Sequence, residues 1–308
     1  MATWPTPDVV YFTRRLFYEH MFSPPMRTKL LPHPFWLLPI AAFSILVLWI
    51  TTPSPAAQRL VSHWRPQAML TQPDQPAHHP NPPPPVLSGA ALPVAQFDLR
   101  VDDGLYADQR QQLADDLQRA LAYDIARFGS SPAARFRASV LLDDSCGIHG
   151  IAYTDVRTVQ TYSCPDISRD RAVAIMAHEF VHQLEQDRYG PAHLNADLIL
   201  SEGLATWCAG DYWLGGKPDF RTYVREQRKG GLFYPLATDY SGLGIAAMNG
   251  LYYEWASFVD YLIGTYGRAK FDALYISGHS APGSSDYAGV YGKRLDELEL
   301  DWQAWLDE

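Results

Sequence analysis

The stretch "MAHEFVHQLEQD", residues 176–187, carries His178, Glu179 and His182 in the order His-Glu-x-x-His. Residues four apart share one face of an α-helix, so the two imidazoles can present ring nitrogens to one ion about 2 Å away. Glu179 is rotated by roughly a third of a turn from that edge, where its carboxylate can reach a water on the ion without becoming a ligand. The alternative is an ordinary amphipathic helix in which two histidines lie four apart by chance.

A third ligand is required, because catalytic zinc typically takes three protein ligands and leaves one position for water. Glu202, in "LILSEGLATW" (residues 198–207), is the twentieth residue after His182 and lies early in an apolar helical stretch. A glutamate on such a helix is costly to bury unless it is paired or bound to a metal, although the helix dipole also favours an acid in the first turn. We therefore predict one Zn²⁺ held by His178, His182 and Glu202, with Glu179 as the base that activates water.

The region from residue 95 to 308 predicts an α+β fold, with a small mixed sheet followed by a mostly helical C-terminal half. Alternating apolar residues predict strands over residues 96–102 and 135–144 and a hairpin over residues 150–164. Helical periodicity predicts a first helix, with a stripe of Leu113, Leu117, Leu121 and Ile125, and further helices over residues 169–188, 196–212, 220–228, 246–266 and 295–306. This region is long enough to bury a core of its own.

The first 94 residues have a different organisation. Residues 35–50 read "FWLLPIAAFSILVLWI" without a charge and predict one transmembrane helix over residues 35–52. Four basic residues precede this helix (Arg14, Arg15, Arg27 and Lys29) and only two lie soon after it (Arg59 and Arg65), which favours a cytoplasmic segment at residues 1–34. Residues 53–94 form a Pro-rich linker that spaces the following domain from the bilayer. A cleaved signal peptide is the alternative to the membrane anchor.

Charge and cysteine content narrow the function classes. The net charge is −9 and no basic surface run is present, so we expect no nucleic-acid partner. Cys146 and Cys164 bracket the predicted hairpin, and either a disulfide or two free thiols is compatible with the sequence. Cys208, on a predicted helix, is expected to be a small buried apolar residue.

The histidine motif followed by Ser201-Glu202-Gly203-Leu204-Ala205 resembles the gluzincin zinc metallopeptidases, in particular the peptidase MA-like domains tethered in bacterial envelopes. The resemblance covers most of residues 96–308. It implies hydrolysis of peptide bonds in a peptide or protein substrate, with the catalytic domain in the periplasm and the chain held as a single-pass inner-membrane protein. It also implies that a strand of the hairpin is an edge strand that binds substrate backbone; a purely structural strand is the alternative.

The stretch "LYYEWASFVDYLIGTYG", residues 251–267, resembles the family's helix whose tyrosine supports the reaction. The register of Ala256, Ser257 and Leu262 assigns this role to Tyr252, with Tyr253 as the alternative. A tyrosine hydroxyl there would donate a hydrogen bond to the oxyanion of the tetrahedral intermediate.

The chain also departs from the family pattern. No Gly-x-Met-Glu-Asn motif precedes His178, so an endopeptidase is preferred to an aminopeptidase. Thr206 stands where some gluzincins carry an aspartate that orients a ligand histidine, so Asp197 or a main-chain carbonyl is expected to take that part. His193, His149 and His279 are expected to be solvated loop residues, although His193 lies near enough to reach the cleft. The rival functions are a non-hydrolytic zinc-containing module that binds peptides and a chance motif on a metal-free scaffold; the sequence predicts no oligomeric state.

Overall fold

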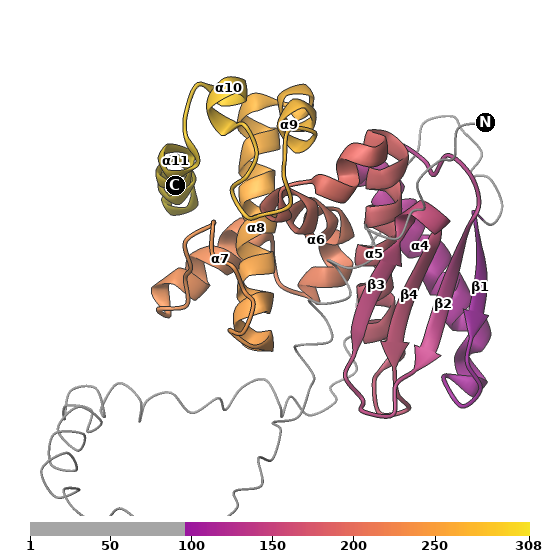
Figure 1. The fold of residues 1–308 in the computed structure, drawn as a ribbon. Helices are drawn as coiled ribbons and strands as arrows, with labels where there is room; N and C mark the ends of the chain where they lie inside the picture. The colour runs from indigo at the N-terminus through magenta and orange to yellow at the C-terminus, as the bar shows by residue number, and fades with distance from the viewer. Residues whose placement is uncertain (1–95) are drawn as a thin grey trace, which may run out of the picture. The chain divides into compact units, whose positions relative to one another are not determined.

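A computed structural model of the chain describes residues 96–308. The predicted cytoplasmic segment, transmembrane helix and Pro-rich linker lie outside the described residues. Among the helices in residues 96–308, none has the length and apolarity needed to cross a bilayer. The described residues form an α+β fold with a small sheet and a mostly helical C-terminal half, as predicted (Figure 1).

The sheet has four strands: β1 (Phe97–Val101), β2 (Phe136–Leu142), β3 (His149–Tyr153) and β4 (Thr158–Ser163). Their order is β1-β2-β4-β3; the first three in this order are parallel, and β3 is antiparallel to β4, so the sheet is mixed. Helix α4 (Arg110–Phe128) connects β1 to β2 and lies on the same face of the sheet as α5 (Figure 1). The predicted hairpin therefore supplies the edge strand β3, joined to β4 through the short turn η2 (Thr154–Val156).

The helical half follows the predicted order. Its helices are α5 (Arg169–Tyr189), α6 (Leu198–Leu214), α7 (Phe220–Lys229), α8 (Ile245–Tyr266), α9 (Arg268–Tyr275), α10 (Tyr287–Tyr291) and α11 (Leu295–Asp307), with 3-10 turns η1 (Ala107–Gln109) and η3 (Gly190–Asn195) elsewhere. Each helix predicted from periodicity is confirmed within a few residues at its ends. The sequence did not predict α9 and α10, because both are too short to show a clear 3.6-residue period.

Helix α5 begins where the Ser168 side chain accepts a hydrogen bond from the backbone N–H of Arg171, and it ends at Gly190. Every residue from Ala172 to Glu185 is buried. The helix is therefore not amphipathic, and the polar side chains of the histidine motif lie inside the protein. Buried imidazoles and carboxylates need hydrogen-bond partners or an ion, so the surrounding residues must supply them.

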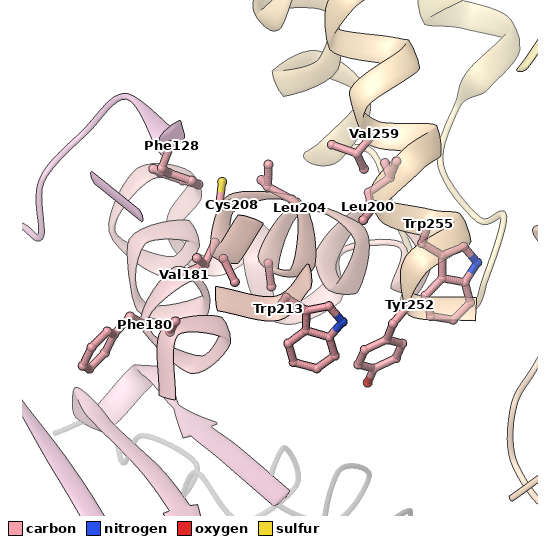
Figure 2. Close-up of a cluster of buried hydrophobic side chains, with 14 of the residues drawn as sticks. Phe128, Phe180, Val181, Leu200, Leu204, Cys208, Trp213, Tyr252, Trp255 and Val259 are labelled. Carbon is pink, nitrogen blue, oxygen red and sulfur yellow. The ribbon is translucent and has the colours of Figure 1, made fainter. Parts of the chain in front are cut away.

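Helix α6 lies between α5 and α8. Figure 2 shows Leu200, Leu204 and Cys208 of α6 packed between Val181 of α5 and Val259 of α8. The approach to α8 is close at Gly203, where an added Cβ would fall 2.8 Å from the carbonyl oxygen of Trp255. Burial on both sides explains why α6 is apolar around its whole circumference, and Cys208 is the buried small residue that was predicted.

A disulfide joins Cys146, in the loop before β3, to Cys164, directly after β4. This settles the two alternatives that the sequence left open. The bridge closes the end of the β3–β4 hairpin from which α5 starts, so it ties the loop before β3 to the segment that leads into α5.

Candidate metal centre

Three of the predicted residues meet at one point between α5 and α6. His178 Nε2 lies 3.1 Å from Glu202 Oε2 and 3.2 Å from His182 Nε2. His182 Nε2 lies 3.6 Å from the same Glu202 oxygen. In a tetrahedral zinc site with bonds of about 2.05 Å, neighbouring ligand atoms lie roughly 3.3 Å apart. The triangle of ligand atoms thus has the size that a tetrahedral ion requires.

The hydrogen bonds on the far side of each imidazole also fit a cation. His182 Nδ1 lies 2.8 Å from Glu185 Oε2, a pure acceptor when ionised, so His182 carries its proton on Nδ1. His178 Nδ1 lies 3.3 Å from the Thr206 hydroxyl. The two Nε2 atoms and the Glu202 carboxylate face one another on the other side of the rings. Two imidazole nitrogens with one carboxylate oxygen form a donor set that Zn²⁺ accepts.

Electrostatics in the site favour positive charge at His182 and negative charge at Glu202, and they keep His178 neutral. Burial lowers the pKa of His178, so this imidazole is neutral and available as a ligand. Burial also opposes the charge on His182, but the carboxylates of Glu185 and Glu202 outweigh it and raise the pKa well above its ordinary value. Burial opposes ionisation of Glu202 as well, yet the two facing imidazoles hold the pKa of this carboxyl well below its ordinary value. A cation among these groups would be stabilised.

The residues that contact the ligand histidines from behind differ from those predicted. Asp197 does not orient a ligand: its carboxylate accepts from the backbone of Ile199 at the start of α6 and from the backbone of Gly283 and Ser285. Instead, the fully buried Glu185, one turn after His182 on the same helix, contacts that ligand. The spacing of three residues after His182 is a signal that was present in the sequence and not used.

His193 is buried and not solvated, contrary to the prediction. Its Nδ1 lies 2.9 Å from the Tyr275 hydroxyl and 3.4 Å from Glu185 Oε2, so it belongs to the network behind His182. The connection between α5 and α6 turns inward there because α9, which the sequence did not predict, packs over it. His149 is half-buried and stacks on Tyr162, whereas His279 is exposed as expected.

Glu179 lies next to the edge strand. Its side chain is 6 % exposed, and it packs against Gly150 of β3 so closely that an added Cβ would fall 2.6 Å from Glu179 Cδ. The carboxylate thus lies between the motif helix and the strand predicted to bind substrate backbone.

The two candidate tyrosines have different surroundings. The Tyr252 ring stacks on the His178 ring at a centroid distance of 5.7 Å. Tyr253 points elsewhere: it donates from its hydroxyl to the carbonyl of Trp213 and packs against Tyr223. The structure therefore brings Tyr252, and not Tyr253, to the ligand histidines.

Trp213 is an aromatic neighbour of the site that sequence reasoning missed. Its ring centroid lies 4.9 Å from that of His178 and 6.0 Å from that of Tyr252. Figure 2 shows the side chains of Trp213 and Tyr252 next to each other. Trp213 reaches this position because α6 kinks at Gly210, a residue with a φ of 48°. No sequence period indicates such a kink.

Comparison with known proteins adds no assignment. No protein-family model matches the chain, and no curated protein matches it significantly.

Proposed function

We propose that this chain is a zinc-dependent metallopeptidase that hydrolyses peptide bonds, most consistently as an endopeptidase. The observation that carries the proposal is the triangle of His178, His182 and Glu202 ligand atoms, with sides of 3.1, 3.2 and 3.6 Å. Glu179 lies one residue after the ligand His178 and against the edge strand, which is where a hydrolytic site needs a base. A structural zinc site has no use for a base at this position.

Each residue of the site has a separate role in the proposed reaction. His178, His182 and Glu202 would hold the zinc ion, which would supply Lewis acidity to lower the pKa of a water toward about 7 and to polarise the substrate carbonyl. Glu179 takes the proton from the attacking water and passes it to the leaving amine, so no net proton is gained or lost by the protein. Tyr252 donates a hydrogen bond to the oxyanion of the tetrahedral intermediate.

The edge strand supports a peptide as the substrate class. β3 is the outer strand of the described sheet beside Glu179, and main-chain hydrogen bonds to such an edge hold an extended chain without requiring a particular side chain. This arrangement favours cleavage within a chain over recognition of a free amine.

The compartment is part of the proposal. A disulfide between Cys146 and Cys164 is typical of oxidising surroundings such as the periplasm. It supports a domain outside the cytoplasm, tethered to the inner membrane by the transmembrane helix predicted at residues 35–52.

Zinc content and cleavage test the function together. The full-length chain and its Glu179→Gln variant are purified, their bound zinc is measured, and both are incubated with a peptide library whose products are read by mass spectrometry. We expect about one zinc per chain in both proteins and cleavage by the native chain only. Glu226→Gln, on the exposed face of α7, is the matched control and should cleave like the native chain.

Two other outcomes would reject the proposal. Zinc without any Glu179-dependent cleavage would indicate the rival function, a zinc-containing module that binds peptides without hydrolysing them. A chain that binds no zinc would contradict both functions.

A further inference from the structure

Two cations lie beside the metal centre. The guanidinium of Arg171 lies 5.9 Å from the Trp213 ring, and the ammonium of Lys217 lies 4.9 Å and 5.3 Å from the rings of Tyr223 and Tyr253. Lys217 also donates to the carbonyl of Leu214 at the end of α6. Neither cation forms an ion pair with any carboxylate in residues 96–308.

Other arginines of the described residues do have acidic partners. Arg157, Arg169 and Arg188 each pair with an aspartate. Burial lowers the pKa of Lys217, and the charge of Arg171 lowers it further, so the two cations repel each other. Aromatic faces hold both in place, which leaves the pair ready to bind an anion.

The distance to the reaction centre can be bounded. The Trp213 ring lies 4.9 Å from the His178 ring and 5.9 Å from the Arg171 guanidinium, so the guanidinium is no more than about 11 Å from His178. An extended peptide advances roughly 3.4 Å per residue. The cation is therefore at most about three residues of substrate away from the ligands.

The order and direction of the strands indicate which end of the substrate lies near Arg171. β4 ends at Ser163 and α5 begins at Arg169, so Arg171 lies at the end of the sheet where β4 stops. β3 is antiparallel to β4, with His149 opposite Tyr162, so β3 starts at this same end. A peptide added to β3 in the more stable antiparallel sense points its C-terminus toward the start of β3. The C-terminal side of the substrate thus approaches Arg171.

We propose that Arg171 and Lys217 form a subsite that binds a carboxylate on the C-terminal side of the cleaved bond, within about three residues of it. The proposal rests on the peptidase function above and names its substrate class: peptides with an anionic group at that place. The carboxylate has two sources, the free C-terminus of a short peptide or the side chain of an aspartate or glutamate in a longer one.

The test compares matched peptides on the purified full-length chain. One random library of fixed length is made with C-terminal carboxylates and again with C-terminal amides, and cleavage sites are read by mass spectrometry. The best sequence is then synthesised in four forms: terminal acid, terminal amide, and longer amidated versions with Glu or Gln three residues after the cleaved bond. We expect kcat/KM to be about tenfold higher for at least one carboxylate form than for its neutral partner. A difference between the terminal acid and the terminal amide identifies the free C-terminus as the source of the carboxylate. A difference between the Glu and Gln peptides identifies the side chain.

Substitutions assign the preference to the two cations. In Arg171→Gln and Lys217→Gln the ratio of kcat/KM for the carboxylate form to that for its neutral partner should fall toward one. In Arg171→Glu this ratio should fall below one. Lys270→Gln is the matched control, because Lys270 is exposed, as Arg171 is, and its ammonium lies 5.9 Å from the aromatic ring of Tyr266, away from the site. Zinc content of each variant reports correct folding.

Failure of this inference is distinguishable from failure of the proposed function. Equal kcat/KM for the acid and neutral forms, or a preference that survives both substitutions, would overturn the carboxylate subsite and leave the peptidase intact. If the native chain cleaves nothing, the peptidase proposal fails. Fluorescence anisotropy of labelled random peptides, made once with C-terminal acids and once with C-terminal amides, is then measured on Glu179→Gln. Equal binding of the two sets overturns the subsite, and an Arg171-dependent preference for the acids supports it.

Discussion

Gly150 on the edge strand β3 lies directly against the side chain of Glu179 on α5. A Cβ added at Gly150 would fall 2.6 Å from both the Cγ and the Cδ atoms of Glu179, a separation that real Cβ atoms do not show. Only glycine therefore leaves room for the carboxylate in its observed position. The strand that we propose to bind the substrate and the base that we propose to activate water are fitted to each other at this one contact.

The substitution Gly150→Ala should displace Glu179 without removing a zinc ligand. A base misplaced by about 1 Å can cost roughly 100-fold in rate, so we expect kcat to fall on that scale while the zinc content stays at the native value. Gly264→Ala in α8 is the control, because an added Cβ meets no atom within 4 Å there. It should leave kcat unchanged. A Gly150→Ala protein with native kcat would show that the contact does not position the base.

Glu185 should control the affinity for zinc through His182. Its carboxylate accepts from His182 Nδ1 at 2.8 Å in a fully buried site, which fixes the orientation of the ligand imidazole. We expect Glu185→Gln to weaken zinc binding by about 10- to 100-fold, measured by competition with a chelator of known affinity. The exposed Glu226→Gln should bind zinc as the native chain does. Native affinity in Glu185→Gln would mean that His182 is oriented by packing alone.

The periodic parts of this fold could be predicted from the sequence. Strands β1, β2 and β4 and helices α4, α7 and α11 each bury one face, so their apolar residues recur with a period that the sequence shows directly. The ligand set was also accessible, because His178 and His182 are close on a helix and a buried glutamate on an apolar helix needs a partner.

The parts that could not be predicted depend on tertiary contacts without a sequence period. His193 lies in a connection, and nothing local indicates that α9 brings Tyr275 to within 2.9 Å of its ring. Trp213 reaches His178 only because of the kink at Gly210. Asp197 was expected near a ligand histidine, but the loop that reaches it, at Gly283 and Ser285, lies more than 80 residues later in the chain.

Tyr252 and Tyr253 should differ in their effects on the reaction. Tyr252 stacks on His178, so Tyr252→Phe should lower kcat by about 100-fold, the typical cost of losing one oxyanion donor, and leave zinc content unchanged. Tyr253→Phe loses the hydrogen bond to the Trp213 carbonyl, so it should cost about 1 kcal/mol of stability with little change in kcat. Steady-state kinetics and urea unfolding of the two variants check this, and the reverse pattern would move the catalytic role to Tyr253.

Glu254 on α8 should make the stability of the protein depend on pH. Its side chain is 1 % exposed, and both carboxylate oxygens face the backbone N–H of Tyr234, at 3.2 and 3.3 Å. Burial raises the pKa of this carboxyl to about 9, helped by the nearby charge of Glu299 and opposed by the Tyr234 hydrogen bond. The native state therefore keeps a proton that the unfolded chain releases near its ordinary pKa of about 4.3.

Because the native state binds more protons than the unfolded state in this window, the free energy of unfolding should decrease as pH rises from about 5 to 9, by up to roughly 1.4 kcal/mol per pH unit from this group. Glu254→Gln keeps the size of the side chain and removes the titration. We expect the variant to match the native chain within about 1 kcal/mol at pH 5 and to exceed its stability increasingly toward pH 9, in urea unfolding at each pH. Glu226→Gln, exposed on α7, should follow the native curve. Parallel curves for the native chain and Glu254→Gln would show that Glu254 is ionised in the folded protein throughout this range.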